Sequence, residues 1–175
     1  IYTAEIARAG NKSQKFTLSH NSCGAEDGYD DCVNDAQRTE RMPESIHHDV
    51  GDVVYYGLSI FLPKDFISIH PAVVTLGQVK LEGLHKPIWI TKLRENYFTI
   101  VTSWNKTECR LIKINEMIGN WTDLIIKAGY SIKGPENNNY FEAWVNDKRK
   151  CLNKKQILTQ KALDSKYKDK KNKIN

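Results

Sequence analysis

Residues 52–62 read Asp-Val-Val-Tyr-Tyr-Gly-Leu-Ser-Ile-Phe-Leu. They show the alternation of side chains that is typical of a β-strand more clearly than any other stretch of the sequence. Four apolar residues recur there at every second position: Tyr56, Leu58, Ile60 and Leu62. Side chains along a β-strand point alternately to two faces, so this spacing predicts a strand that lays one face on a core. Pro63 follows at once and predicts where the strand ends.

Further short stretches of strand-like composition follow, separated by clusters of Gly, Pro and Asn. They cover residues 72–81, 87–93, 97–104, 122–132 and 140–145. The helical pattern is weak and is confined to residues 156–167. Many short strands at similar spacing predict a sandwich or jelly roll of two stacked sheets, in a single domain over residues 1–175.

The charge is unevenly distributed along the chain. The net charge is +5, with a lysine-rich terminal segment over residues 150–175 and a run of acids between Glu26 and Asp35. A lysine-rich terminus is most often a solvated tail, but a basic surface also attracts nucleic acid, acidic lipid or acidic polysaccharide. No stretch approaches about 18 apolar residues, so we expect no membrane span.

Two of the four cysteines lie close together in the sequence. A bond between Cys23 and Cys32 would stabilise the chain by about 2–3 kcal/mol on the chain-entropy model. Such a bond predicts a secreted or periplasmic protein, whereas two free thiols would indicate a reduced cytosol. Cys109 and Cys151 could pair or stay free, and no Cys or His spacing matches a common zinc site.

Polar residues in the strand of residues 72–81 are candidates for a site. Gln78 and Lys80 share a face by alternation, either lining a concave polar sheet or lying on an exposed edge. His85 follows in the turn after this strand and is a candidate acid or base, although a loop histidine is more often only exposed to solvent.

A second group of candidates follows Cys32. Arg38 and Glu40 share a face if that segment is extended, and they form either a polar site or a plain surface ion pair. We expect no cofactor. The acidic loop between Glu26 and Asp35 is a solvated loop by default, with calcium binding as the alternative, because its spacing does not match the EF-hand pattern.

Several segments, taken in order, resemble the heparin lyase I-like polysaccharide lyases. Residues 23–40 resemble the family's opening order of Cys, Asp-Cys and Arg-Ser-Glu, and residues 51–63 resemble its Tyr-x-x-Ser-Ile-x-Leu-Pro strand. Residues 76–80, Leu-Gly-Gln-Val-Lys, stand where the family often has Gly-Gln-Phe-His. Residues 119–123 and 141–148 resemble its Gly-x-Trp-His and Val-Trp-Val-Asn-Gly-Lys segments.

This resemblance implies an all-β, two-sheet antiparallel jelly-roll β-sandwich of the concanavalin-like kind, with a concave face for an acidic polysaccharide. It also implies cleavage of a uronic-acid-containing glycan by β-elimination. Gln78 would bind the uronate carboxylate with help from Arg38. Lys80 stands where the family usually has His, and His85 could take over as the base. A family strand that carries a tyrosine has no counterpart before Asn175, so the sandwich is expected to lack its last strand.

Three functions remain open at this point. The first is a polysaccharide lyase, acting as a monomer on an acidic polysaccharide, with neither nucleic acid nor membrane as a partner. The second is a carbohydrate-binding jelly roll without catalysis, which Lys80 and the missing tyrosine favour. The third is a nucleic-acid binder, supported only by the basic tail.

Overall fold

The computed structural model describes residues 2–4, 6–19, 23–26, 29–41, 48–81, 86–133 and 140–164. The chain forms two compact units, residues 1–47 and residues 48–175, and each is described here by itself. His85 lies outside the described residues, as does the end of the lysine-rich segment from residue 165 onward.

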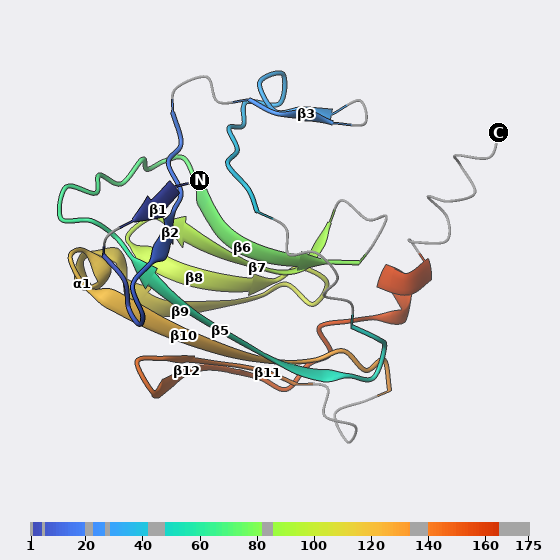
Figure 1. Cartoon of the computed structure of the whole chain (residues 1–175). Coiled ribbons are helices and arrows are strands. Elements are labelled where there is room, and N and C mark those ends of the chain that lie inside the picture. The colour runs from blue at the N-terminus through green and yellow to red at the C-terminus, as the bar shows by residue number, and fades with distance from the viewer. Residues whose placement is uncertain are drawn as a thin grey trace. The chain divides into compact units, whose positions relative to one another are not determined.

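The larger unit is a sandwich of two four-stranded antiparallel sheets (Figure 1). One sheet has the order β12-β11-β10-β5, from strands Lys148–Asn153, Phe141–Val145, Trp121–Gly129 and Val53–Phe61. The other has the order β6-β7-β8-β9, from strands Val74–Lys80, Pro87–Arg94, Tyr97–Thr102 and Thr107–Lys113. The short helix α1 (Ile114–Met117) follows β9. The predicted two-sheet antiparallel β-sandwich is confirmed.

The core lies between the two sheets, and alternation along the strands supplies it. On β10, Leu124, Ile126 and Ala128 are fully buried. They pair in register with Leu58, Tyr56 and Val54 of β5, so these partners lie on the same face of the sheet. From the other sheet, Trp89, Leu93, Phe98 and Ile100 are buried. The period-two pattern of residues 52–62 therefore has the orientation that the sequence predicts.

A polar connection crosses this apolar core. The hydroxyl groups of Tyr56 and Tyr130 lie 2.7 Å apart, and the indole N–H of Trp89 donates to the Tyr130 hydroxyl at 2.9 Å. Burial raises the pKa of both phenols above the ordinary value of 10.0. Because Tyr56 lies on β5 and Trp89 on β7, these hydrogen bonds tie one sheet to the other.

A disulfide joins the edges of the two sheets. Cys109 of β9 is bonded to Cys151 of β12, with 5.8 Å between their Cα atoms. The sequence alone did not decide whether these two cysteines pair or stay free, and in the structure they are bonded to each other. Both strands are irregular beside the bond: Leu111 is an extra residue between the partners of Phe98 and Thr99, and Lys150 is an extra residue between those of Ala143 and Trp144.

The smaller unit contains two hairpins. β1 (Tyr2–Ala4) pairs with β2 (Ser13–Lys15), and β3 (Ala25–Glu26) pairs with β4 (Tyr29–Asp30). Cys23 and Cys32 are bonded as predicted, with 5.4 Å between their Cα atoms. The bond closes the loop that carries the second hairpin.

The segment after β12 packs on the core as far as the structure describes it. Ile157, Leu158 and Ala162 are fully buried, and residues 160–164 are helical. Of the predicted helical pattern of residues 156–167, residues 160–164 are therefore helical, and residues 165–167 lie outside the described residues. None of the described helices is long and apolar enough to cross a membrane.

Candidate functional site

One face of the β6-β7-β8-β9 sheet is turned away from the core, and we call it the glutamine face. Val79 and Trp89 pair with each other and pack in the core, so the neighbouring pair Gln78 and Ile90 points the opposite way. The cross-strand pairs of the four strands show which other described residues lie on this face. They are Thr75, Gln78, Lys80, Ile90, Lys92, Arg94, Tyr97, Thr99, Val101, Glu108, Arg110 and Lys113.

Cross-strand rows organise this face. Gln78, Ile90, Val101 and Glu108 form one row across the four strands, and Thr75, Lys92, Thr99 and Arg110 form the next. A third row runs from Arg94 through Tyr97 to Lys113. Each row thus holds a polar or charged residue at both ends, and the cations of this face lie on β6, β7 and β9.

Gln78 is half-buried, and its side-chain amide forms no hydrogen bond with any residue that the structure describes. A side-chain amide carries two N–H donors and a carbonyl acceptor, so this group can bind a ligand. Lys80 is exposed and lies on the same face, separated from Gln78 only by the core residue Val79. Gln78 and Lys80 therefore lie on the same face of the sheet, as alternation predicts.

The ion pairs of the glutamine face are loose and exposed. Arg94 lies 3.7 Å from Glu108, and Arg110 lies 3.5 Å from Glu95. The side chains of both arginines are more than half exposed. Pairs of this kind contribute at most about 1 kcal/mol, so a carboxylate or sulfate on a ligand can replace their partners. Arg110 also lies over the ring of Tyr97, 4.9 Å from its centroid.

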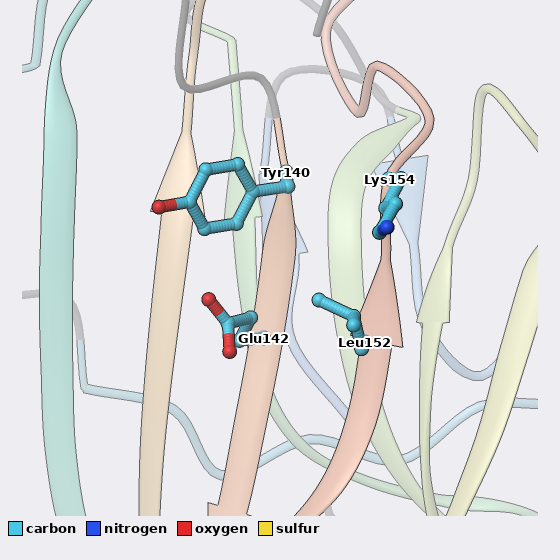
Figure 2. A pocket seen from close by; sticks show the side chains of 4 residues that line it. All are labelled: Tyr140, Glu142, Leu152 and Lys154. Carbon is cyan, nitrogen blue, oxygen red and sulfur yellow. The ribbon is translucent and has the colours of Figure 1, made fainter.

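The opposite outer face of the sandwich belongs to the other sheet, and we call it the tyrosine face. Its described members are Tyr55, Ser59, Phe61, Trp121, Asp123, Ile125, Lys127, Glu142, Trp144 and Arg149, with Tyr140 beside them. Lys127 donates to the hydroxyl of Tyr140, and this hydrogen bond raises the pKa of the lysine. A hollow of about 290 Å³ lies at this face. Figure 2 shows the four side chains that line it: Tyr140 precedes β11, which carries Glu142, and Lys154 follows β12, which carries Leu152.

The other predicted candidates lie in the smaller unit. Arg38 donates to Asp31 at 2.9 Å and lies 3.3 Å from Glu40. The predicted ion pair between Arg38 and Glu40 is present, and Asp31 is an additional partner. Asp31 is buried and also accepts the backbone N–H of Gly24 at 3.2 Å. Part of the acidic loop thus holds the arginine instead of lying in solvent.

No group of His, Cys, Asp and Glu side chains among the described residues gathers closely enough to hold a metal ion. Within the loop, Asp30 accepts the backbone N–H groups of Cys32 at 2.8 Å and Val33 at 3.3 Å. That carboxylate shapes the turn. Asp27, another acid of this loop, lies outside the described residues.

Apart from Lys80, sequence reasoning did not single out the cations of the glutamine face. Lys92 and Arg94 were detectable, because they alternate in a strand whose other positions are apolar. Arg110 and Lys113 were not, because the extra residue Leu111 lies between them and breaks the alternation. Only the register of β9 against β8 brings all four onto one face.

The comparisons with known proteins agree with this architecture. The family model described as "Polysaccharide lyase" matches residues 2–171. Neither the search of curated proteins nor the search of solved structures returned a match. The matched range includes both units, both disulfides and the whole glutamine face. This chain is therefore a member of the polysaccharide lyase family.

Proposed function

We propose that this chain cleaves a uronic-acid-containing polysaccharide by β-elimination and binds it on the glutamine face. The observation that carries the proposal is Gln78, whose amide lacks a described partner on a face that also holds Lys92 and Arg110. Membership of the polysaccharide lyase family supports a polysaccharide substrate. The cations on the same face favour an acidic one.

The chemistry follows from what each group can donate. An amide N–H from Gln78 bound to the uronate carboxylate would stabilise the negative charge that develops when the C5 proton leaves. The electrons of the C5–H bond then form the C4–C5 double bond, and the C4–O4 bond breaks. The departing O4 takes a proton from a general acid.

Lys80 suits the second proton transfer better than the first. An ammonium group carries protons and can give one to O4, whereas it has no lone pair with which to accept the proton from C5. We therefore propose Lys80 as the acid and His85 as the base. Lys80 is the last residue of β6, the strand that carries Gln78, and His85 follows it five positions later in the sequence.

Arg38 and Glu40 remain proposed substrate-binding residues. The guanidinium has five N–H donors, and the two contacts to Asp31 and Glu40 leave donors for a sugar carboxylate. Asp31, being buried and bonded to the backbone, would fix the position of Arg38. The two disulfides further support a secreted or periplasmic location.

The direct test is incubation with glucuronan, alginate and heparin, followed by the ultraviolet absorbance of the unsaturated uronate. A rise in absorbance with one of these polymers, lost in Gln78→Ala, supports the proposal. Absence of unsaturated product with every uronate polymer, from protein that binds them, would contradict it.

The second candidate function is glycan binding without turnover. Lys80 in place of the family's histidine favours it, because an ammonium group has no lone pair with which to accept the C5 proton. Binding of an acidic glycan without product, weakened by Gln78→Ala, would establish this alternative.

A further inference from the structure

A second basic feature lies at the edge of the sandwich, where β9 approaches β12. A hollow of about 430 Å³ opens there, beside α1 and the turn between β11 and β12. Its lining residues are Tyr97, Arg110, Leu111, Ile112, Lys113, Glu116, Val145, Asn146, Lys148 and Lys150. We call this feature the lysine hollow.

The lysine hollow carries an excess of positive charge. Of the described residues that line it, four are cationic and only Glu116 is acidic. Lys113, Lys148 and Lys150 form no ion pair with any residue in the described part of the chain. A concave surface lined by charges of one sign concentrates the field, so this hollow attracts anions more strongly than a flat surface would.

Local backbone geometry brings these lysines together. Lys148 and Lys150 are two positions apart, so alternation places them on the same side of the strand, and the register irregularity in β12 makes Lys150 an extra residue without a cross-strand partner. Both Lys148 and Lys150 line the hollow, whereas Arg149 between them lies 3.4 Å from Glu142 of the tyrosine face. The bond between Cys109 and Cys151 holds the two strands together beside Arg110 and Lys150.

We propose that the lysine hollow binds a second acidic group, a sulfate or a carboxylate, of the same polysaccharide that Gln78 holds. This inference rests on the proposed function and names a distal contact for that substrate. Tyr97, Arg110 and Lys113 belong to both the glutamine face and the hollow, so the two surfaces are continuous.

The separation of the two surfaces predicts a dependence on chain length. Gln78 lies on β6, and the hollow's cations Arg110 and Lys113 lie on β9, which is three strand spacings away, or about 14 Å. A single sugar cannot reach both. A glycan of several sugars can, and it gains the hollow's cations as additional contacts.

A polysaccharide fits this surface better than a nucleic acid does. Nucleic-acid grooves commonly combine cations with exposed aromatic rings on which bases stack. Here Tyr97 is the aromatic residue among those lining the hollow that the structure describes, and Arg110 already lies over its ring.

The experiment compares three neighbouring substitutions in β12. Lys148→Gln with Lys150→Gln removes two charges from the hollow, and Arg149→Gln removes one from the opposite face. Binding of long heparin, long glucuronan and a disaccharide of each is measured by titration at two salt concentrations. We expect the double variant to lose about 10-fold in affinity for a long chain and under about 2-fold for the disaccharide.

A control variant and a further variant separate the charge of the hollow from the charge of the rest of the surface. Arg149→Gln should leave all affinities within about 2-fold, and Lys113→Gln should reproduce part of the loss for long chains. Loss with heparin alone identifies a sulfate as the bound group, and loss with both polymers identifies an acidic group of either kind.

Three outcomes would overturn the inference. They are an equal loss in Arg149→Gln, an equal loss for the disaccharide, and a higher affinity for single-stranded DNA than for either glycan. Because binding is measured without turnover, a protein that lacks elimination but shows the chain-length effect would refute the proposed function and leave the hollow as a binding site.

Discussion

The two outer faces of the sandwich use similar residue types in opposite ways. On the tyrosine face, neighbours across the strands satisfy one another: Ser59 donates to Asp123 at 2.6 Å, and Arg149 lies 3.4 Å from Glu142. The glutamine face has ion pairs of similar length, from Arg94 to Glu108 and from Arg110 to Glu95. Lys92, however, faces Thr75 and Thr99 instead of a carboxylate. Both faces therefore hold exposed ion pairs, and the glutamine face in addition has Gln78 and Lys92, which have no side-chain partner among the described residues.

The two faces therefore differ in which of them is the better candidate for binding a glycan. Aromatic residues alone would favour the tyrosine face, which carries Tyr55, Trp121 and Trp144. Charge pairing favours the glutamine face, because an acidic polymer needs cations that lack a strong partner. Four measurements test whether the two faces and the contacts between the sheets differ in this way.

The largest effect should come from the bond that joins the two sheets. Replacing Cys109 and Cys151 by Ser opens a loop of 42 residues and should lower the free energy of unfolding by about 4 kcal/mol. Chemical denaturation measures this loss, and the same change at Cys23 and Cys32 is the comparison. A smaller loss than for that shorter loop would mean that the sheets hold together without the bond.

The next effect concerns the glutamine face directly. Gln78→Glu replaces a donor by a carboxylate that repels the uronate, and it should reduce the rate of elimination by roughly 10²- to 10³-fold. Ile125→Glu places the same charge on the tyrosine face and should leave the rate unchanged. Equal losses in both variants would show that the two faces do not differ in function.

A third measurement tests the connection inside the core. Tyr130→Phe removes the acceptor of the Trp89 indole N–H and should lower the free energy of unfolding by roughly 1–3 kcal/mol. Because burial raises the pKa of Tyr56 and Tyr130 in the folded state, their protonated forms stabilise the fold below about pH 10.

This contribution disappears as the pH rises above that value, because the unfolded phenols ionise first. Stability should fall by up to about 1.4 kcal/mol per pH unit for each tyrosine, and the fall should be shallower in Tyr130→Phe. Denaturant titrations between neutral and strongly alkaline pH follow it. A fall of the same slope in both proteins would assign the effect to other groups.

The smallest effect is expected on the tyrosine face. A double-mutant cycle with Arg149→Gln and Glu142→Gln should give a coupling below about 1 kcal/mol, because the arginine is largely exposed. Thermal unfolding of the four proteins provides the values. A larger coupling would show that this face depends on its ion pairs for stability.

The sequence predicts most of the sandwich, because its longer strands alternate cleanly. Residues 52–62 and 140–145 carry enough apolar positions to fix both the strand and its buried face. The sequence does not predict β9 in the same way, because Leu111 is an extra residue and stands next to another apolar residue, Ile112, so the alternation is interrupted. The strands of the smaller unit contain two or three residues and show no period at all.

The candidate site is predictable only in part for the same reason. Gln78 and Lys80 share one strand, so alternation relates them. The partner of Arg38 is seven residues away, and no local period connects it to Asp31. The lysine hollow and the bond from Cys109 to Cys151 depend on how two sheets meet, which no local pattern in the sequence contains.

The order of the cysteines along the chain has a consequence for biosynthesis. Four cysteines can pair in three ways, and in this protein each one is bonded to its nearest neighbour in sequence: Cys23 to Cys32, and Cys109 to Cys151. Cys23 and Cys32 can therefore pair before Cys109 or Cys151 has been synthesised. Once they have paired, Cys151 is the one remaining partner in this sequence for Cys109. We expect correct pairing without a disulfide isomerase, and pulse-labelling in cells that lack one would measure it.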